Sequence, residues 1–362
     1  MPRVYNAIGL MSGTSLDGVD VALLETNGVD YVFPKGFFYA PYPDSLKQRI
    51  RASFGLREQT EELRMVERDL TLAHRDAVLK FLRQEDLGTE DIDLIGFHGQ
   101  TITHDPDHGF TWQIGDGPLL ARELGVDVVY DFRTADVKSG GQGAPLLPLY
   151  HRARALSSNL VLPVAILNIG GVSNVTWLGE DSILAFDTGP GNALIDDCVL
   201  KETGEKFDRD GLWARQGQTD YVCLSNWLSH PYFSQKPAKS LDRGAWDVQS
   251  ISKLSFVDAL ATLTCFTIAA NVKAGEHFPA PPLAWYVTGG GRNNTAIMEG
   301  LQKALGVPVL PVDTLGWNGD ALEAEGFAYL AVRSVMGLPL SVPGTTKVPC
   351  PQTGGILAPK WA

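Results

Sequence analysis

The sequence lacks several features that would assign it to common classes of protein. Its 362 residues include four cysteines, Cys198, Cys223, Cys265 and Cys350, which are widely spaced and form no CxxC pair. This spacing favours buried free thiols in a reducing compartment over a disulfide framework or a metal site. No Lys/Arg run is present, and 30 basic against 42 acidic residues give a net charge of −12. That charge disfavours nucleic acid or an anionic membrane as a partner.

Long hydrophobic runs and targeting signals are also missing. We find no apolar run that approaches the ~18 residues required to span a membrane. No charged region followed by an apolar core marks a signal peptide at the N-terminus. The expected location is therefore the cytoplasm, with no membrane partner. Hydrophobic residues make up 44% and charged residues 20% of the chain, as in folded globular proteins, and its length suffices for two domains.

The most informative motif is a Gly-rich turn between two apolar runs, over residues 8–18. Gly13 and Gly18 allow backbone angles closed to other residues, so that amide groups can point at an anion. Asp17 would repel a bare phosphate, which suggests a divalent cation between the two. No Gly-Lys-Ser/Thr ends the turn and no helix follows it, which excludes a P-loop and a dinucleotide fingerprint. An ordinary hairpin turn is an equal alternative at this point.

Alternating strand and helix patterns predict an α/β protein with two halves. Strands are expected over residues 5–11, 19–25, 92–97, 112–115, 126–131, 164–169, 174–178, 183–186 and 283–288. Helices are expected over residues 61–87, 119–124, 193–203, 295–305 and 320–336. We divide the chain into an N-terminal domain (1–158), a C-terminal domain (159–320) and a terminal helix and tail (321–362) that returns to the N-terminal domain.

Glycine-containing loops recur in both halves, at residues 13–18, 168–174, 188–192 and 288–294. The first three follow an apolar strand, and the fourth precedes a helix. One such loop is weak evidence, but four loops in two α/β halves suggest a cleft that grips a polyphosphate, because ligands favour such junctions.

These motifs resemble the actin/hexokinase/Hsp70 superfamily of ATP-dependent proteins and, within it, the anhydro-N-acetylmuramic acid kinase family. The matching segments extend over nearly the full chain: IGLMSGTSLDGVDVAL, GFHGQTITHDP, TWQIGDGPLLA, DFRTADVKSGGQGAPL, LNIGGVSNVT, FDTGPGNALID, VTGGGRNN and GWNGDALEAEGFAYLA. The resemblance implies a two-domain, actin-like (ribonuclease H-like) α/β fold with the active site in the interdomain cleft. It also implies ATP and Mg²⁺ as cofactors and a homodimer.

The reaction implied by the resemblance belongs to recycling of the bacterial cell wall. It converts 1,6-anhydro-N-acetylmuramic acid, ATP and water into N-acetylmuramic acid 6-phosphate and ADP. O6 of this amino sugar is held in an ether bridge to C1. The reaction therefore requires a base near C1 and a phosphate clamp with Mg²⁺ near O6.

Asp187 is the candidate base, because the resemblance places the catalytic aspartate in its FDTGPGN motif. It follows an apolar strand and is expected to begin a turn. The alternative is a turn-capping aspartate that accepts from the amides of Gly189 or Gly191. Asp17 is the candidate for organising Mg²⁺, through coordinated water, and turn capping is again its alternative.

The resemblance also implies the residues that contact ATP. The first phosphate loop comprises Gly13, Thr14, Ser15, Leu16, Asp17, Gly18, Val19 and Asp20. The second phosphate loop comprises Asn168, Gly170 and Gly171, and the nucleoside loop comprises Gly289, Gly290 and Gly291. At each position, a glycine turn required only for packing is the alternative.

For the sugar, Arg133 is the candidate to bind the lactyl carboxylate, because a guanidinium binds carboxylates bidentately. An ion pair with Asp131 or Asp136 is the alternative. Glu323, in the first turn of the last helix, is expected to bond a sugar hydroxyl or to favour the positive helix end. The other expected sugar contacts are Gly189, Asn192 and a loop carrying His98, Gln100 and Thr101.

His104 and His108 lie close to two aspartates and raise the possibility of a metal cluster. The interposed Pro106 and Gly109 favour a solvated turn instead.

Two competing functions are open from the sequence. A levoglucosan-type kinase opens the same bridge in 1,6-anhydroglucose, without pockets for the N-acetyl and lactyl groups. A non-catalytic, ATP-gated hinge protein of the actin or Hsp70 type would need a polymerisation surface or a peptide-binding domain, and no third domain is apparent.

Overall fold

The computed structural model describes residues 3–241 and 244–361 and divides the chain into two compact units. Unit 1 consists of Met1–Asn159 and Ala321–Ala362, and unit 2 consists of Leu160–Asp320. Unit 1 is therefore assembled from two segments that are separated in the sequence by the whole of unit 2.

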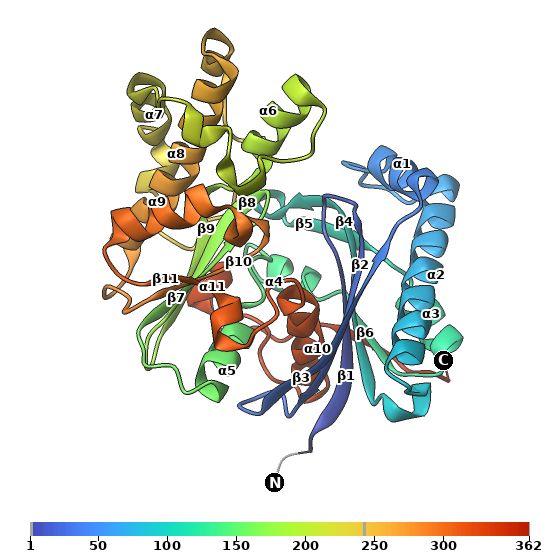
Figure 1. Ribbon diagram of the computed structural model, residues 1–362. Coiled ribbons are helices and arrows are strands. Elements are labelled where there is room, and N and C mark those ends of the chain that lie inside the picture. The colour runs from blue at the N-terminus through green and yellow to red at the C-terminus, as the bar shows by residue number, and fades with distance from the viewer. Residues whose placement is uncertain (1–2, 242–243, 362) are drawn as a thin grey trace. The chain divides into compact units, whose positions relative to one another are not determined.

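A seven-stranded mixed sheet is the centre of unit 1 (Figure 1). The strand order is β12-β6-β4-β1-β2-β3, and β5 pairs with β4. Strands β1, β2 and β3 are antiparallel neighbours, whereas β4 is parallel to both β1 and β6. The strands are β1 (Tyr5–Ser12), β2 (Gly18–Thr26), β3 (Val32–Pro41), β4 (Leu94–Asp105), β5 (Phe110–Ile114), β6 (Val128–Tyr130) and β12 (Ile356–Ala358).

Helices cover both faces of this sheet. Ile8 and Leu10 of β1 pack in one core with apolar residues of α2, whose buried positions recur at helical spacing. Gly9 points to the opposite face, where an added Cβ would lie 1.8 Å from the carbonyl oxygen of Ala324 in α10. The backbone of α10 thus rests directly on β1. The helices of unit 1 are α1 (Asp44–Ala52), α2 (Glu61–Gln84), α3 (Gly117–Leu124), α4 (Thr134–Lys138), α5 (Pro148–Ser157), α10 (Leu322–Val335) and α11 (Pro343–Thr346).

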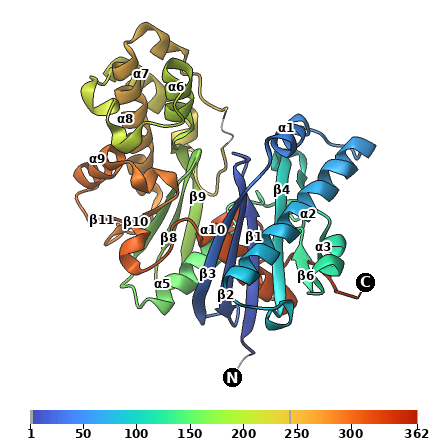
Figure 2. The same ribbon diagram turned by 45° about the vertical axis from the view of Figure 1, so that its right-hand side comes forward.

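Unit 2 contains a five-stranded sheet in the order β11-β10-β7-β8-β9. Helix α8 lies in the hydrophobic core of this unit and contacts α6, α7 and α9 (Figure 2). The strands are β7 (Val164–Ile169), β8 (Val172–Leu178), β9 (Ile183–Pro190), β10 (Trp285–Thr288) and β11 (Val309–Pro311). The helices are α6 (Ala193–Thr203), α7 (Tyr221–Leu228), α8 (Phe256–Ala274) and α9 (Thr295–Leu305).

The two sheets repeat one strand order. In each, three antiparallel strands are continued by two parallel ones: β3-β2-β1-β4-β6 in unit 1 and β9-β8-β7-β10-β11 in unit 2. This duplicated arrangement confirms the predicted α/β class and actin-like ATPase fold.

Several predicted elements differ from the structure. The loop expected at His98–Thr101 is wrong, because β4 continues as a strand to Asp105 and pairs there with β5. The turn expected at Asp187 is also wrong, because β9 extends to Pro190. The tail beyond Leu338 contains β12, which pairs antiparallel with β6. The cysteines of the described residues are free, but three are only half-buried and Cys350 is exposed.

The expectation that no apolar run reaches membrane-spanning length is wrong for one stretch of the chain. Residues Phe256–His277 form a helix that is long and apolar enough to cross a membrane. Leu260, Leu263 and Phe266 of this helix are buried in the core of unit 2. The stretch is therefore a core helix, whose composition reflects burial within the protein.

Two buried histidines should make folding stability depend on pH. Burial lowers the pKa of both His74 and His151 to about 4, against an unfolded value near 6.5. Between pH 6.5 and 4 the unfolded chain therefore binds protons that the folded chain excludes. Each histidine should reduce the free energy of unfolding by roughly 2 to 3 kcal/mol at about pH 4.5, with no effect above pH 6.5. Measuring the free energy of unfolding with urea at pH 4.5 and above pH 6.5 checks this prediction. His74→Leu should show a smaller pH dependence, and an unchanged one would contradict the assignment.

Candidate functional site

The first glycine loop joins β1 to β2, and hydrogen bonds to β4 hold it in place. The Leu16 amide donates to the Gly13 carbonyl at 3.1 Å, and Leu16 is buried with a φ of 62°. The Gln100 side chain, which is fully buried, donates from Nε2 to the same Gly13 oxygen at 3.2 Å. Ser12 Oγ donates to the Gly99 carbonyl. Gln100 thus fixes the shape of the loop from inside the protein.

Two carboxylates accompany this loop. Asp17 is exposed at the start of β2, and Asp20 pairs with Tyr39 across β2 and β3. Burial raises the pKa of the Tyr39 hydroxyl, and the charges of Asp17 and Asp20 raise it further, so both carboxylates lie near that hydroxyl. Among residues 3–241 and 244–361, no group of three or more His, Cys, Asp or Glu residues is arranged to hold a metal. Mg²⁺ at phosphate sites needs only one or two carboxylates besides phosphate and water, which suits this pair.

Arg133 is anchored by His98. The guanidinium donates from Nε to His98 Nε2 at 3.0 Å, so Nε2 is the unprotonated ring nitrogen. His98 Nδ1 therefore carries the proton and donates to the Gly99 carbonyl at 2.9 Å. Burial and the charge of Arg133 lower the pKa of His98 well below its usual range, which keeps the ring neutral. His98 is thus placed as a support for Arg133, on a strand and not on the predicted loop.

Helix α10 brings two more side chains to this region of unit 1. The Phe327 ring centroid lies 4.5 Å from that of His98 and 5.9 Å from Arg133 Cζ. Glu323 occupies the first turn of α10, as predicted, and its side chain is exposed. Although the Glu323 side chain reaches solvent, desolvation by the surrounding protein raises the pKa of its carboxyl, and the nearby Arg133 charge opposes this. Thr101 accepts a hydrogen bond from Gln113 at 3.2 Å.

In unit 2, the two glycine loops predicted to bind phosphate and the nucleoside converge at the end of β7. The carbonyl of Gly170 accepts from the Asn192 amide at 2.7 Å, and the Asn192 side chain donates to the Ile169 carbonyl at 3.0 Å. Gly289 has a φ of 74°, and an added Cβ would lie 2.3 Å from Asn168 Oδ1. The two loops therefore pack closely against each other, and Gly289 leaves no room there for a side chain.

Asp187 lies on β9, five residues before Asn192, and is fixed at three points. Its amide donates to the Lys239 carbonyl at 3.0 Å, and its own carbonyl accepts from the Tyr232 hydroxyl at 2.5 Å. Its carboxylate oxygen Oδ2 accepts from the Leu241 amide at 2.8 Å. The amide of Leu241 thus bonds to the carboxylate, a contact that the turn-capping alternative does not include.

Tyr232 and Lys239 were not singled out from the sequence. Lys239 Nζ donates to the Tyr232 carbonyl at 2.8 Å and lies 4.4 Å from the centre of the Tyr232 ring. Burial lowers the pKa of Lys239 to about 8. Because their segment between α6 and α8 has no regular hydrophobic period, no sequence signal marks either residue.

Helix α8 supplies a polar support that the sequence does signal. Thr267 Oγ1 donates to the Gly191 carbonyl at 2.8 Å, and Asn271 Oδ1 accepts from Thr188 Oγ1 at 2.5 Å. The two helical residues are four positions apart on a buried face of an apolar helix. Polar side chains at this spacing in a hydrophobic helix indicate a specific partner.

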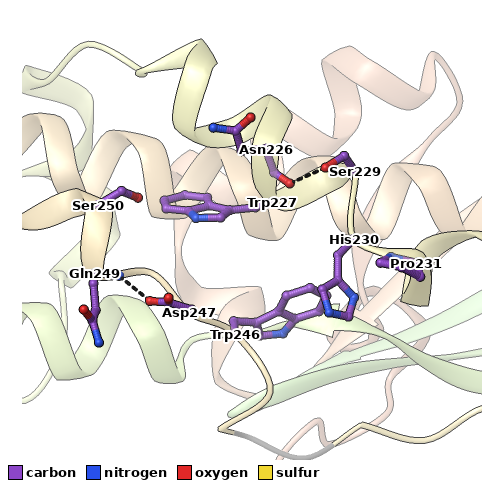
Figure 3. A pocket seen from close by; sticks show the side chains of 9 residues that line it. All are labelled: Asn226, Trp227, Ser229, His230, Pro231, Trp246, Asp247, Gln249 and Ser250. Carbon is purple, nitrogen blue, oxygen red and sulfur yellow. Dashed lines mark hydrogen bonds between the residues drawn. The ribbon is translucent and has the colours of Figure 1, made fainter.

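The pocket in Figure 3 lies elsewhere on unit 2 and has a volume of about 480 Å³. Trp227 and Trp246 line it together with His230, but none of the predicted site residues does. Because none of the glycine-loop residues lines it, we do not assign the reaction to this pocket.

The expected solvated turn near His104 and His108 is present. His108 Nδ1 contacts Asp105 at 2.7 Å in a short turn, and Arg57 pairs with the same carboxylate. His104 Nδ1 bonds to Thr111 instead, at 2.9 Å.

Comparison with known proteins places the chain in a family. The family model for anhydro-N-acetylmuramic acid kinase matches residues 5–360. The protein of that name from Paramagnetospirillum magneticum is 51% identical, over 96% of this chain and 98% of its own. The one from Rhizorhabdus wittichii is 48% identical, over 97% and 98% respectively. Among solved structures, component A of Acidaminococcus fermentans (R)-2-hydroxyglutaryl-CoA dehydratase has a TM-score of 0.47 at 13% identity, over 91% of this chain and 99% of that one. On the full-length family match and these sequence identities, the chain belongs to the anhydro-N-acetylmuramic acid kinase family.

Proposed function

We propose that the protein uses ATP and water to convert 1,6-anhydro-N-acetylmuramic acid into N-acetylmuramic acid 6-phosphate and ADP. Membership of the kinase family supports this reaction. The observation that carries the mechanism is the three-point fixation of Asp187 on β9, close to the converging glycine loops. Such fixation suits a carboxylate whose catalytic effect depends on orientation.

In this reaction Asp187 accepts a proton from the water that attacks C1. The new bond joins water oxygen to C1 as the bond from C1 to O6 breaks. O6 then forms a bond to the γ-phosphorus, and the bond from that phosphorus to the β,γ-bridging oxygen breaks to release ADP. A carboxylate is a weak base at neutral pH, so the position of the water must supply much of the rate.

ATP is bound, in this proposal, by the backbone amides of the glycine loops named above. Asp17 and Asp20 would hold Mg²⁺ through water, and the ion would neutralise charge on the phosphates. Arg133 binds the lactyl carboxylate, and Glu323 accepts a hydrogen bond from a sugar hydroxyl. The homodimer implied by the resemblance is part of the same proposal.

The decisive experiment measures ADP release with Mg·ATP, with 1,6-anhydro-N-acetylmuramic acid and 1,6-anhydroglucose offered in parallel. We expect a strong preference for the muramic sugar and a 6-phosphate product. Preference for 1,6-anhydroglucose would support the proposed ring opening and phosphorylation but would show that the muramic sugar is not the substrate. Absence of turnover with either sugar, despite ATP binding, would overturn the proposal in favour of an ATP-gated hinge protein.

A further inference from the structure

Asp136 is a buried carboxylate that takes no part in the reaction proposed above. It lies on α4, three residues after Arg133, and only 2% of its surface is exposed. The sequence left open an ion pair between these two residues. In the structure both carboxylate oxygens of Asp136 accept hydrogen bonds from other groups, which belong to the loop that follows α4 and to the distant C-terminal segment.

The first partner is the Gly-rich loop that follows α4. Oδ1 of Asp136 accepts from the Gly143 amide at 2.6 Å. The carbonyl of the same Gly143 accepts from Arg133 Nη1, also at 2.6 Å. The backbone of Gly143 therefore links the two side chains: its amide bonds to Asp136 and its carbonyl bonds to the Arg133 guanidinium. Gly143 has a φ of 66°, which a side chain would strain, so this loop conformation is specific.

The second partner is the C-terminal segment beyond α10. Oδ2 of Asp136 accepts from Thr346 Oγ1 at 2.6 Å and from Ser341 Oγ. Both hydroxyl residues are at most 1% exposed. The carbonyl of Thr346 also accepts from the Gln142 amide at 2.6 Å, next to Gly143. The C-terminal segment thus contacts the loop both directly and through Asp136.

We propose that Asp136 is a positioning residue through which Ser341 and Thr346 hold Arg133 in the geometry that binds the substrate carboxylate. The inference rests on the proposed function, because it requires Arg133 to bind the lactyl group. His98 fixes Nε of Arg133 and Gly143 fixes Nη1, so two of its nitrogens are anchored to unit 1. Loss of the Gly143 anchor frees half of the guanidinium, and bidentate recognition depends on that orientation.

The test replaces the Thr346 hydroxyl by a methyl group, so that the side chain keeps its shape and loses its hydrogen bond to Asp136. Thr346→Val should raise KM for 1,6-anhydro-N-acetylmuramic acid by ~10-fold, about the effect of one charge-assisted hydrogen bond. KM for ATP and KM for 1,6-anhydro-N-acetylglucosamine, which lacks the lactyl carboxylate, should change less than about twofold. Thr346→Ser restores the hydroxyl and should restore KM.

Thr345 provides a matched control. It lies beside Thr346 in α11 and is equally buried, but its hydroxyl donates to the Val342 carbonyl at 2.9 Å and not to Asp136. Thr345→Val should lower Tm as much as Thr346→Val does, without changing KM for the muramic sugar. If both variants raise KM for both sugars equally, the role of Thr346 is only structural and the inference fails. If the wild-type protein does not turn over the muramic sugar, the proposed function itself fails.

Discussion

Asp187→Asn is expected to retain ATP binding and to lose between about 10²-fold and 10⁴-fold in kcat, the usual range for loss of a general base. The asparagine side chain keeps an oxygen that can accept from the Leu241 amide, so the local structure should persist. It has no basic group to take a proton from the attacking water. Single-turnover measurement of ADP formation and calorimetric titration of ATP separate the two effects.

Asp181→Asn is the matched control for this variant. Asp181 is exposed in the turn between β8 and β9, on the same hairpin as Asp187, and lies outside the converging loops. It should have wild-type kcat and KM. Activity of Asp187→Asn within tenfold of wild type would remove Asp187 from the role of base.

Arg133→Ala should raise KM for 1,6-anhydro-N-acetylmuramic acid about 30-fold or more, because removing one partner of a charge pair that the bound sugar buries typically costs 2–5 kcal/mol. KM for 1,6-anhydroglucose, which has no carboxylate, should change by less than about threefold. Steady-state kinetics with both sugars and saturating ATP give the comparison. Equal effects on the two sugars would argue against recognition of the lactyl group.

Arg133→Lys sharpens this prediction. Lysine keeps the positive charge but cannot donate to His98 Nε2 and to the Gly143 carbonyl in the same fork geometry. If charge alone binds the sugar, Arg133→Lys should resemble wild type. We expect it to resemble Arg133→Ala more closely, since His98 and Gly143 orient the guanidinium through two different nitrogens.

Local sequence signals correctly predicted the helices whose ends are marked by capping residues. Helices α6 and α9 have the predicted ranges because each ends before a left-handed glycine, Gly204 or Gly306, and Asn294 caps the start of α9. The glycine loops were located because three of them follow an apolar strand and the fourth precedes a helix. In unit 2 the structure brings Asn168, Gly170, Gly289 and their neighbours together, as a shared site requires.

The features that the sequence did not predict depend on contacts between segments that are distant in the sequence. Gly99 suggested a loop, yet β4 passes through it because β5 pairs with the far half of the strand. The short strand β12 owes its conformation to β6, more than two hundred residues earlier. The support of Asp187 comes from Tyr232 and Leu241, in a segment without periodicity. Tertiary pairing of this kind leaves no local signal.

The discontinuous make-up of unit 1 has a consequence for synthesis of the protein. Residues 1–159 leave the ribosome long before residues 321–362, while the intervening unit 2 is one continuous stretch. Until α10 emerges, the sheet face that carries Gly9 is without the helix that rests on it. Until β12 emerges, the edge of β6 is unpaired. An uncovered sheet face and an open edge are the surfaces through which nascent chains aggregate. Unit 2 can therefore complete its fold during translation, whereas unit 1 completes its fold only after α10 and β12 have been made.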